Sequence, residues 1–219
     1  LYTGAYGPTS EVLELAESPL DLFLFFMPKK FWRKVAAESN RYFLQNLAAR
    51  VDRMYANQKT PGKKTRDELM MREAKKDDIE AHEIMHVLGL LLARMLNPRH
   101  CCFRDHWSTE RVGAVARGTF NDYMPRHRFE HIMANVHFTN NADPQAASDR
   151  AWKVRSVVKT LRETFPRGYT TPPVVSFDKG VIPSRYRNNP TRQYLKNKPQ
   201  KWGTKLFLTC CADTAYYMR

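Results

Sequence analysis

The sequence predicts an α+β fold, in which a largely helical region of about 165 residues precedes the first strands of an incomplete α/β core. Apolar residues recur at helical spacing up to Phe165, whereas short apolar runs with alternating polarity follow Gly168. The formal net charge is +14, and residues 151–219 hold 14 Lys and Arg against 3 Asp and Glu. The strand-rich end is therefore expected to face a partner with dense negative charge, of which nucleic acid is the usual example.

The first helices are predicted from helix-start and helix-break signals. Residues 1–17 contain glycine and proline and are expected to form an irregular lead-in. Ser18 is a good N-cap and Pro19 suits the first turn, so a helix is predicted from there. Pro28 interrupts it, and a second helix is predicted from about Lys29.

Later helices follow a charged segment. Residues 57–78 are rich in charge and contain Pro61-Gly62, which predicts a solvated loop or insertion without an assigned function. The strongly apolar segment after it predicts a mostly buried helix that ends at Asn97-Pro98. The predicted helices of this part are 77–96, with Leu88, Leu91, Leu92 and Met95 buried, 127–137 and 147–165.

Strands are predicted only after Gly168. They cover Val174–Asp178, Thr204–Cys211 and the start of a third strand at Ala215–Met218. We therefore divide the chain into a helical region, residues 18–168, and a strand-bearing region, residues 169–219.

Asp178 is the candidate site residue, because it ends a short apolar run and is followed by a long basic stretch. A carboxylate beside positive charge suits a metal-dependent phosphodiester enzyme, in which an oxygen ligand holds Mg²⁺ and cations hold the nucleic-acid backbone. The alternative is an ordinary aspartate that caps a turn at a strand end. The candidate DNA-binding residues are Arg185, Arg187, Arg192, Lys196, Lys198, Lys201 and Lys205.

Two other motifs are weaker. His82-Glu83-Ile84-Met85-His86 has the spacing of a zinc protease, but Leu92 stands where a third histidine is required, which favours a packing helix. The adjacent pairs Cys101-Cys102 and Cys210-Cys211 lack the spacing of a metal chelate, which favours free cysteines in a reducing compartment. No apolar run approaches membrane-spanning length, and no membrane partner is expected.

An ordered set of segments resembles the transposase domain of the piggyBac family of DNA transposons. The most specific is the run from Asn197 to Lys205, which resembles the family's Asn-Lys-Pro-x-Lys-x-Gly-x-Lys element. The other segments are Ser18–Phe23, Ser39–Tyr42, Gly89–Leu92, Asp105–Ser108, Met124–Phe129, His137–Asn141 and Trp152–Arg155.

The resemblance implies a helical dimerisation and DNA-binding region, followed from Val174 by a truncated ribonuclease-H-like core. It places Asp178 on the family's first catalytic aspartate, which holds divalent metal ions, here expected to be Mg²⁺. It also implies DNA as a partner, a homodimer and a nuclear location.

Two departures from the family pattern affect the expected activity. Lys179 replaces the Glu that follows the aspartate, and like charge is expected to lower metal affinity. The chain ends 41 residues after Asp178, before the family's other two aspartates. We therefore expect a fragment or domesticated derivative that binds DNA without catalysing transposition. The alternative is a non-catalytic helical protein-interaction module with a solvated basic segment.

Overall fold

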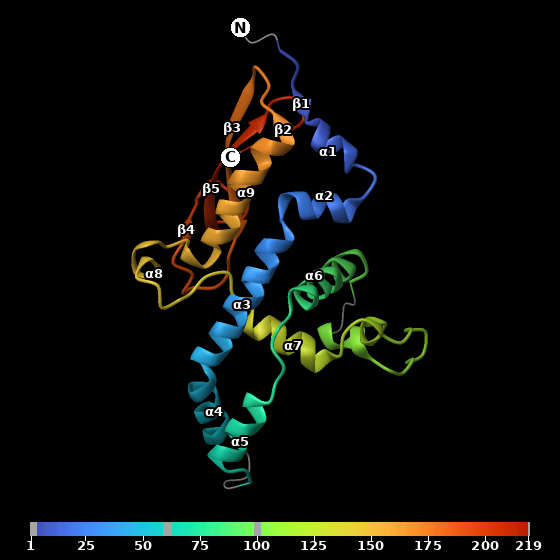
Figure 1. Ribbon diagram of the computed structural model, residues 1–219, viewed down its shortest axis with the longest axis vertical. Helices are drawn as coiled ribbons and strands as arrows, with labels where there is room; N and C mark the ends of the chain where they lie inside the picture. The colour runs from blue at the N-terminus through green and yellow to red at the C-terminus, as the bar shows by residue number, and fades with distance from the viewer. Residues whose placement is uncertain (1–3, 59–62, 99–101, 219) are drawn as a thin grey trace. The chain divides into compact units, whose positions relative to one another are not determined.

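A computed structural model describes residues 4–58, 63–98 and 102–218 (Figure 1). The chain forms two compact units. Unit 1 comprises Leu1–Phe31 and Asn141–Arg219, and unit 2 comprises Trp32–Asn140. Unit 2 is thus an insertion in the chain of unit 1. The sequence predicted a division of the chain between residues 168 and 169, with helices before and strands after that point. The compact units differ, because unit 1 combines the N-terminal helices with the C-terminal strands.

The helices of unit 1 include α1 (Ser10–Glu14), α2 (Pro19–Phe26) and α9 (Arg155–Gly168). The predicted N-cap is confirmed, because the Ser18 hydroxyl accepts a hydrogen bond from the Asp21 amide. Helix α9 packs on α2 through the rings of Phe26 and Phe165, whose centroids are 5.4 Å apart. Two shorter helical pieces precede α9, namely α8 (Gln145–Ser148) and a 3₁₀ turn, Trp152–Val154.

The predicted irregular lead-in is wrong for part of residues 1–17. Strand β1 (Gly7–Pro8) pairs with β2 (Tyr169–Thr170), and α1 follows it directly. The Thr9 amide also donates to the Gly168 carbonyl at 3.1 Å. Pairing with a distant segment orders this stretch, and local composition does not reveal such a partner.

A three-stranded antiparallel sheet forms the rest of unit 1, in the order β3 (Val175–Pro183), β5 (Trp202–Cys211), β4 (Arg192–Tyr194). The first two strands confirm the predicted ones, but β3 continues five residues beyond Asp178. The prediction that Asp178 ends a strand is therefore wrong. The predicted third strand is also wrong, because Tyr217 makes only an isolated bridge to Cys210, and β4 is the third strand of this sheet.

Unit 2 is helical, with two short 3₁₀ helices, Phe103–Trp107 and Phe120–Asp122. Its α-helices are α3 (Lys29–Gln45, beginning in unit 1), α4 (Leu47–Ala56), α5 (Arg66–Ala74), α6 (Ala81–Leu96) and α7 (Arg126–Asn135). The core includes the fully buried Val35, Val51 and Ile132. Near the two ends of the insertion, the His137 amide donates to the Ser39 hydroxyl at 3.0 Å, and the His137 ring stacks on Tyr42.

Two predictions about unit 2 are corrected. The segment 57–78 contains helix α5, which starts with a capping box between Thr65 and Glu68 and buries Leu69. Helix α6 buries Ile84, Val87 and Leu90, whereas Leu92 and Met95 are 60% and 76% exposed. Apolar residues cover more than one side of this helix, so composition alone could not show which side faces the core.

Several segments that carry the family resemblance hold unit 2 together. The side-chain amide of Asn40 accepts a hydrogen bond from the Ile79 N–H through Oδ1 at 2.8 Å and donates one to the Ile79 carbonyl through Nδ2 at 3.1 Å. The Trp107 indole donates to the Met124 carbonyl at 2.8 Å. These residues stabilise the helical unit, and none of these contacts forms a reactive centre.

Arg128 forms the densest polar contact of unit 2. Its guanidinium donates to both carboxylate oxygens of Glu83 at 2.6 Å and to the carbonyls of Asp77 and Asp78. Burial raises the pKa of Glu83, but the hydrogen bonds from Arg128 and from the Glu80 amide outweigh it, so the net pKa is lowered. Glu83 is therefore engaged in an ion pair, which supports the packing helix over a zinc protease motif. Among the described residues, no helix is long and apolar enough to cross a membrane.

Candidate nucleic-acid interface

Asp178 lies in the middle of β3, opposite Leu208 of β5. Its side chain is exposed, and one carboxylate oxygen accepts a hydrogen bond from the Lys179 amide at 2.6 Å. Within the described ranges, no group of three or more His, Cys, Asp or Glu residues could hold a metal ion. Two-metal phosphodiester sites hold both ions between several carboxylates, and Asp178 has no second acidic ligand beside it among the described residues, so these residues do not by themselves fit the metal site that the resemblance implies.

Lys179 is turned away from Asp178. Adjacent residues of a strand point to opposite faces of the sheet, and the register places Lys179 on the face of Phe207 and Asp178 on the face of Leu208. The expected repulsion between Lys179 and a metal at Asp178 is therefore weaker than adjacency in sequence suggests. The same alternation puts the Lys179 side chain on the sheet face that also carries Lys205.

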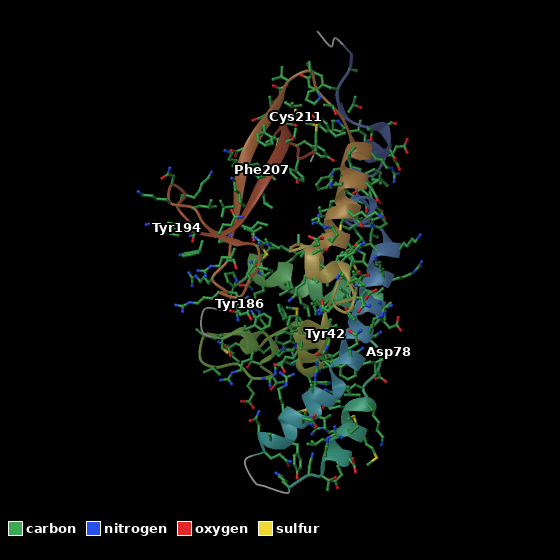
Figure 2. All side chains as sticks on the ribbon, turned by 90° about the vertical axis from the view of Figure 1, so that its left-hand side faces the viewer. Tyr42, Asp78, Tyr186, Tyr194, Phe207 and Cys211 are labelled. Atoms are coloured by element: carbon green, nitrogen blue, oxygen red, sulfur yellow. The ribbon has the colours of Figure 1, made fainter. Side chains whose placement is uncertain are left out.

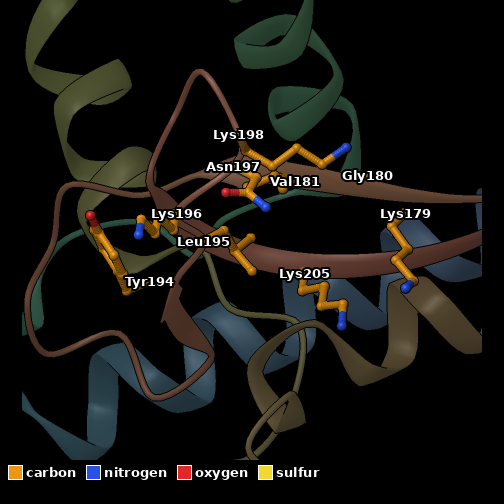
Figure 3. A pocket seen from close by; sticks show the side chains of 9 residues that line it. All are labelled: Lys179, Gly180, Val181, Tyr194, Leu195, Lys196, Asn197, Lys198 and Lys205. Atoms are coloured by element: carbon orange, nitrogen blue, oxygen red, sulfur yellow. The ribbon is translucent and has the colours of Figure 1, made fainter.

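These lysines line one pocket of about 290 Å³, which we call the hairpin pocket (Figure 3). Lys179 and Lys205 leave neighbouring strands on the same face, because the register pairs Val181 with Lys205. Lys196 and Lys198 come from the β4–β5 loop. The loop is closed by a hydrogen bond from the Leu195 amide to the Lys201 carbonyl at 2.7 Å. Four lysine side chains thus contribute to the lining of one open pocket, and no Asp or Glu is among its lining residues.

The remaining predicted DNA-binding residues lie outside the hairpin pocket. The Arg192 guanidinium lies 4.0 Å from the centroid of the Trp202 ring, and its Nε donates to the Ser184 carbonyl. Lys201 is exposed on the β4–β5 loop, and Arg185 and Arg187 are exposed on the β3–β4 loop. The structure therefore brings together Lys196, Lys198 and Lys205 of the predicted set and adds Lys179. Side-chain alternation along the strand could have identified Lys179, because it lies two residues before Val181, which pairs with Lys205.

Aromatic side chains, among them Tyr194 and Phe207, also lie along this part of unit 1 (Figure 2). Tyr194 packs against Trp202 with ring centroids 5.0 Å apart. On the sheet face that carries Lys179 and Lys205, Phe177 stacks on Phe207, and the Lys205 ammonium lies 4.6 Å from the Phe207 ring centroid. Cation–π contact holds the Lys205 side chain in place, which lowers the entropy cost of binding an anion there.

The three cysteines that the structure describes form neither a disulfide nor a metal site. Cys102, Cys210 and Cys211 are free, and Cys101 lies outside the described residues. Hydrogen bonds from Thr214 and from the Tyr169 hydroxyl lower the pKa of the Cys211 thiol to about 7. The side chain is 1% exposed, so it is inaccessible to solutes. These findings support free cysteines.

One solved structure shares the fold of the chain. It is a cryo-EM structure of a piggyBac transposase synaptic complex with hairpin DNA, with a TM-score of 0.71 and 19% identity. The match covers 99% of this chain and 40% of that one, so the chain spans less than half the length of that transposase. No curated protein matches the sequence.

Comparison of the sequence with models of protein families identifies the family of the chain. The model described as Transposase IS4 matches residues 18–219, which is nearly the whole chain and includes all of unit 2, most of unit 1 and the hairpin pocket. The mixed helical and strand structure agrees with the fold match to the piggyBac transposase. The chain belongs to the IS4 transposase family, and its fold is that of the matching part of a piggyBac transposase.

Proposed function

We propose that this transposase-derived chain binds duplex DNA through the hairpin pocket. The observation that carries the proposal is that Lys179, Lys196, Lys198 and Lys205 all line one pocket, with no Asp or Glu among its lining residues. Four cations at one site attract phosphate groups and release the counterions that surround DNA. The piggyBac transposase of the same fold was solved with hairpin DNA, which supports DNA as the partner.

Charge reversal at the four lysines is expected to weaken DNA binding and its salt dependence together. Each lost phosphate contact lowers the slope of log K against log salt by about 0.9, so the Lys179→Glu, Lys196→Glu, Lys198→Glu, Lys205→Glu variant should lose about 3 to 4 from the slope. We expect affinity for a short duplex at low salt to fall about 100-fold or more. Fluorescence anisotropy over a salt series measures both quantities.

A charge-matched control separates the pocket from net charge. Lys30, Lys34, Lys75 and Lys159 are exposed and lie outside the hairpin pocket, so their replacement by Glu should reduce affinity much less. Equal losses in the two variants would contradict the assignment to the hairpin pocket. No binding by the unaltered chain at low salt would favour the alternative, a helical protein-interaction module with a solvated basic segment.

We also propose that the sheet is the beginning of a ribonuclease-H-like core, with Asp178 at the first acidic position. The support is the long antiparallel pair β3–β5, which holds Asp178 near the centre of a nine-residue strand. Asp178 would be one oxygen ligand of a divalent metal ion that activates a nucleophile when bound. Because the described residues do not complete such a site, we propose that this chain alone does not cleave DNA.

A plasmid nicking assay tests the absence of cleavage. With Mg²⁺ or Mn²⁺ present, we expect supercoiled plasmid to stay intact with the unaltered chain and with the Asp178→Asn variant alike. Metal-dependent nicking that disappears in the Asp178→Asn variant would show that one carboxylate suffices, and would overturn this part of the proposal.

Homodimer formation and nuclear location are further proposals, which rest on the sequence resemblance to the piggyBac family. Sedimentation analysis measures the first, and imaging of the tagged protein in cells measures the second. A monomer at micromolar concentration, or a tagged protein excluded from nuclei, would contradict them.

A further inference from the structure

We propose that His82 and His86 of helix α6 form a binding site for a divalent transition-metal ion, with Zn²⁺ as the expected ligand. The two histidines are four residues apart, so they lie one turn apart on the same side of the helix. Both residues are exposed, and their ring centroids are 5.8 Å apart. DNA binding through the hairpin pocket does not involve this pair, which lies in unit 2.

The packing of helix α6 does not account for the two histidines. The side of the helix that faces the core carries the buried Ile84, Val87 and Leu90. His82 and His86 lie on the exposed side, so their imidazoles contribute little to the core. Packing thus explains the apolar residues of this segment and leaves two imidazoles open to solvent.

The separation of the two rings suits one shared ion. A Zn²⁺ ion bound to one nitrogen of each ring at a near-tetrahedral angle would hold the ring centroids about 5 Å apart, given the usual Zn–N distance. The observed 5.8 Å is close to this value, and rotation about the side-chain bonds can supply the difference. The ring planes lie at 84° to each other and do not stack, so the rings can turn without loss of a stacking contact.

The nearby carboxylates are engaged elsewhere, so the site has two protein ligands. Both oxygens of Glu83 accept hydrogen bonds from Arg128, and the Glu80 side chain accepts from the Glu83 amide in the capping box. Within the described part of the chain, no third His, Cys, Asp or Glu completes a larger group of ligands. An ion held by the two imidazoles keeps open coordination positions for water or an external ligand. The site differs from a zinc protease, because its glutamate is not free to act as a base.

The surroundings of the pair leave room for an external ligand. His86 also lines an apolar pocket of about 390 Å³, together with Met85 and Tyr123. Gly89 lies one turn further along the helix, and a Cβ there would meet no atom within 4 Å outside the helix backbone. The type of donor selects the ion, because imidazole nitrogen suits Zn²⁺, Ni²⁺ and Cu²⁺, whereas Mg²⁺ prefers oxygen ligands.

Titration with Zn²⁺ in competition with a metal-sensitive indicator measures the affinity of the site. His82→Gln and His86→Gln should each weaken binding about 100-fold, because the second imidazole of a chelate binds at a high effective concentration. The control is His127→Gln, which changes an exposed histidine of helix α7 and should leave the affinity unchanged. An excess of Mg²⁺ should not displace Zn²⁺.

A rearranged variant tests the spacing while it keeps the number of histidines. His86→Gln combined with Gly89→His places the two imidazoles seven residues apart, about 10 Å along the helix, which is too far for one ion to bridge. This variant should bind Zn²⁺ as weakly as His86→Gln alone. Proton NMR of the imidazole rings adds a local readout, in which Zn²⁺ should shift the signals of His82 and His86 but not those of His127. It also separates the imidazoles from the free thiol of Cys102, another zinc-binding group.

Three results would overturn the metal site. The first is equal affinity of the unaltered chain and the two single variants. The second is full binding by the rearranged variant, which would show that spacing does not matter. The third is a Zn²⁺-induced shift of only one imidazole, which would indicate a single contact in place of a chelate. None of these results bears on the hairpin pocket, which has no histidine among its lining residues.

Discussion

Replacement of Arg128 by Met is expected to lower the free energy of unfolding by about 3 to 5 kcal/mol, because it leaves a mostly buried carboxylate without its partner. Arg128 and Glu83 are each 17% exposed in their side chains, and the pair is bidentate. The same change removes the hydrogen bonds that hold the carbonyls of Asp77 and Asp78 before helix α6. Denaturant unfolding measures the loss.

The sign of the pH dependence follows from the lowered pKa of Glu83. Its contribution to stability is present above the unfolded pKa of about 4.3 and is lost as pH falls through the lower folded value. The difference between the unaltered chain and the Arg128→Met variant should therefore shrink in acid. A matched control is Arg126→Met, whose exposed pair with Glu130 should be worth less than about 1 kcal/mol. If adding Glu83→Gln to Arg128→Met recovers no stability, the explanation by a buried charge fails.

Replacement of Gly118 by Ala is expected to destabilise unit 2 by about 3 kcal/mol, because the added methyl group meets backbone that cannot move aside. A Cβ at Gly118 would lie 2.1 Å from the His106 carbonyl oxygen and 2.8 Å from the Trp107 nitrogen. The Gly118 amide also donates to the Ser108 carbonyl at 2.7 Å, which fixes this close approach. Thermal unfolding, followed by the tryptophan signal, measures the effect.

Gly89→Ala is the control for the glycine prediction. Gly89 lies in helix α6, and a Cβ there would meet no atom within 4 Å outside the helix backbone. Alanine has a higher helix propensity than glycine, so the Gly89→Ala variant should be more stable by about 0.5 to 1 kcal/mol. Destabilisation by both substitutions to a similar extent would contradict the steric argument at Gly118.

The sequence predicted the elements whose signals are local. Helix α2 was marked by a capping serine and a proline, and β5 by alternation, and both formed where expected. Helix α5 was missed although Thr65 and Glu68 have capping-box spacing, because the charge of the segment outweighed that signal. Strand β4 has three residues and is defined by its partner, so no local pattern could predict it.

The candidate interface was predicted in part. The Lys-rich run from Lys196 to Lys205 was recognised, but the loop and strand geometry decided which lysines converge. Lys179 belongs to the basic stretch after Asp178 but was not among the candidate DNA-binding residues, and strand alternation places it on the same face as Lys205.

The insertion of unit 2 within unit 1 has a consequence for folding kinetics. In the unfolded chain, the two parts of unit 1 are separated by 109 residues, and closing such a loop costs about 4 kcal/mol of chain entropy. Folded unit 2 holds its own ends together through the contacts of His137 with Ser39 and Tyr42, which shortens the effective loop to a few residues. We therefore expect unit 2 to fold first and to bring the two parts of unit 1 close together before they fold. Pulse-labelled hydrogen exchange should then show protection of unit 2 amides before protection of unit 1 amides.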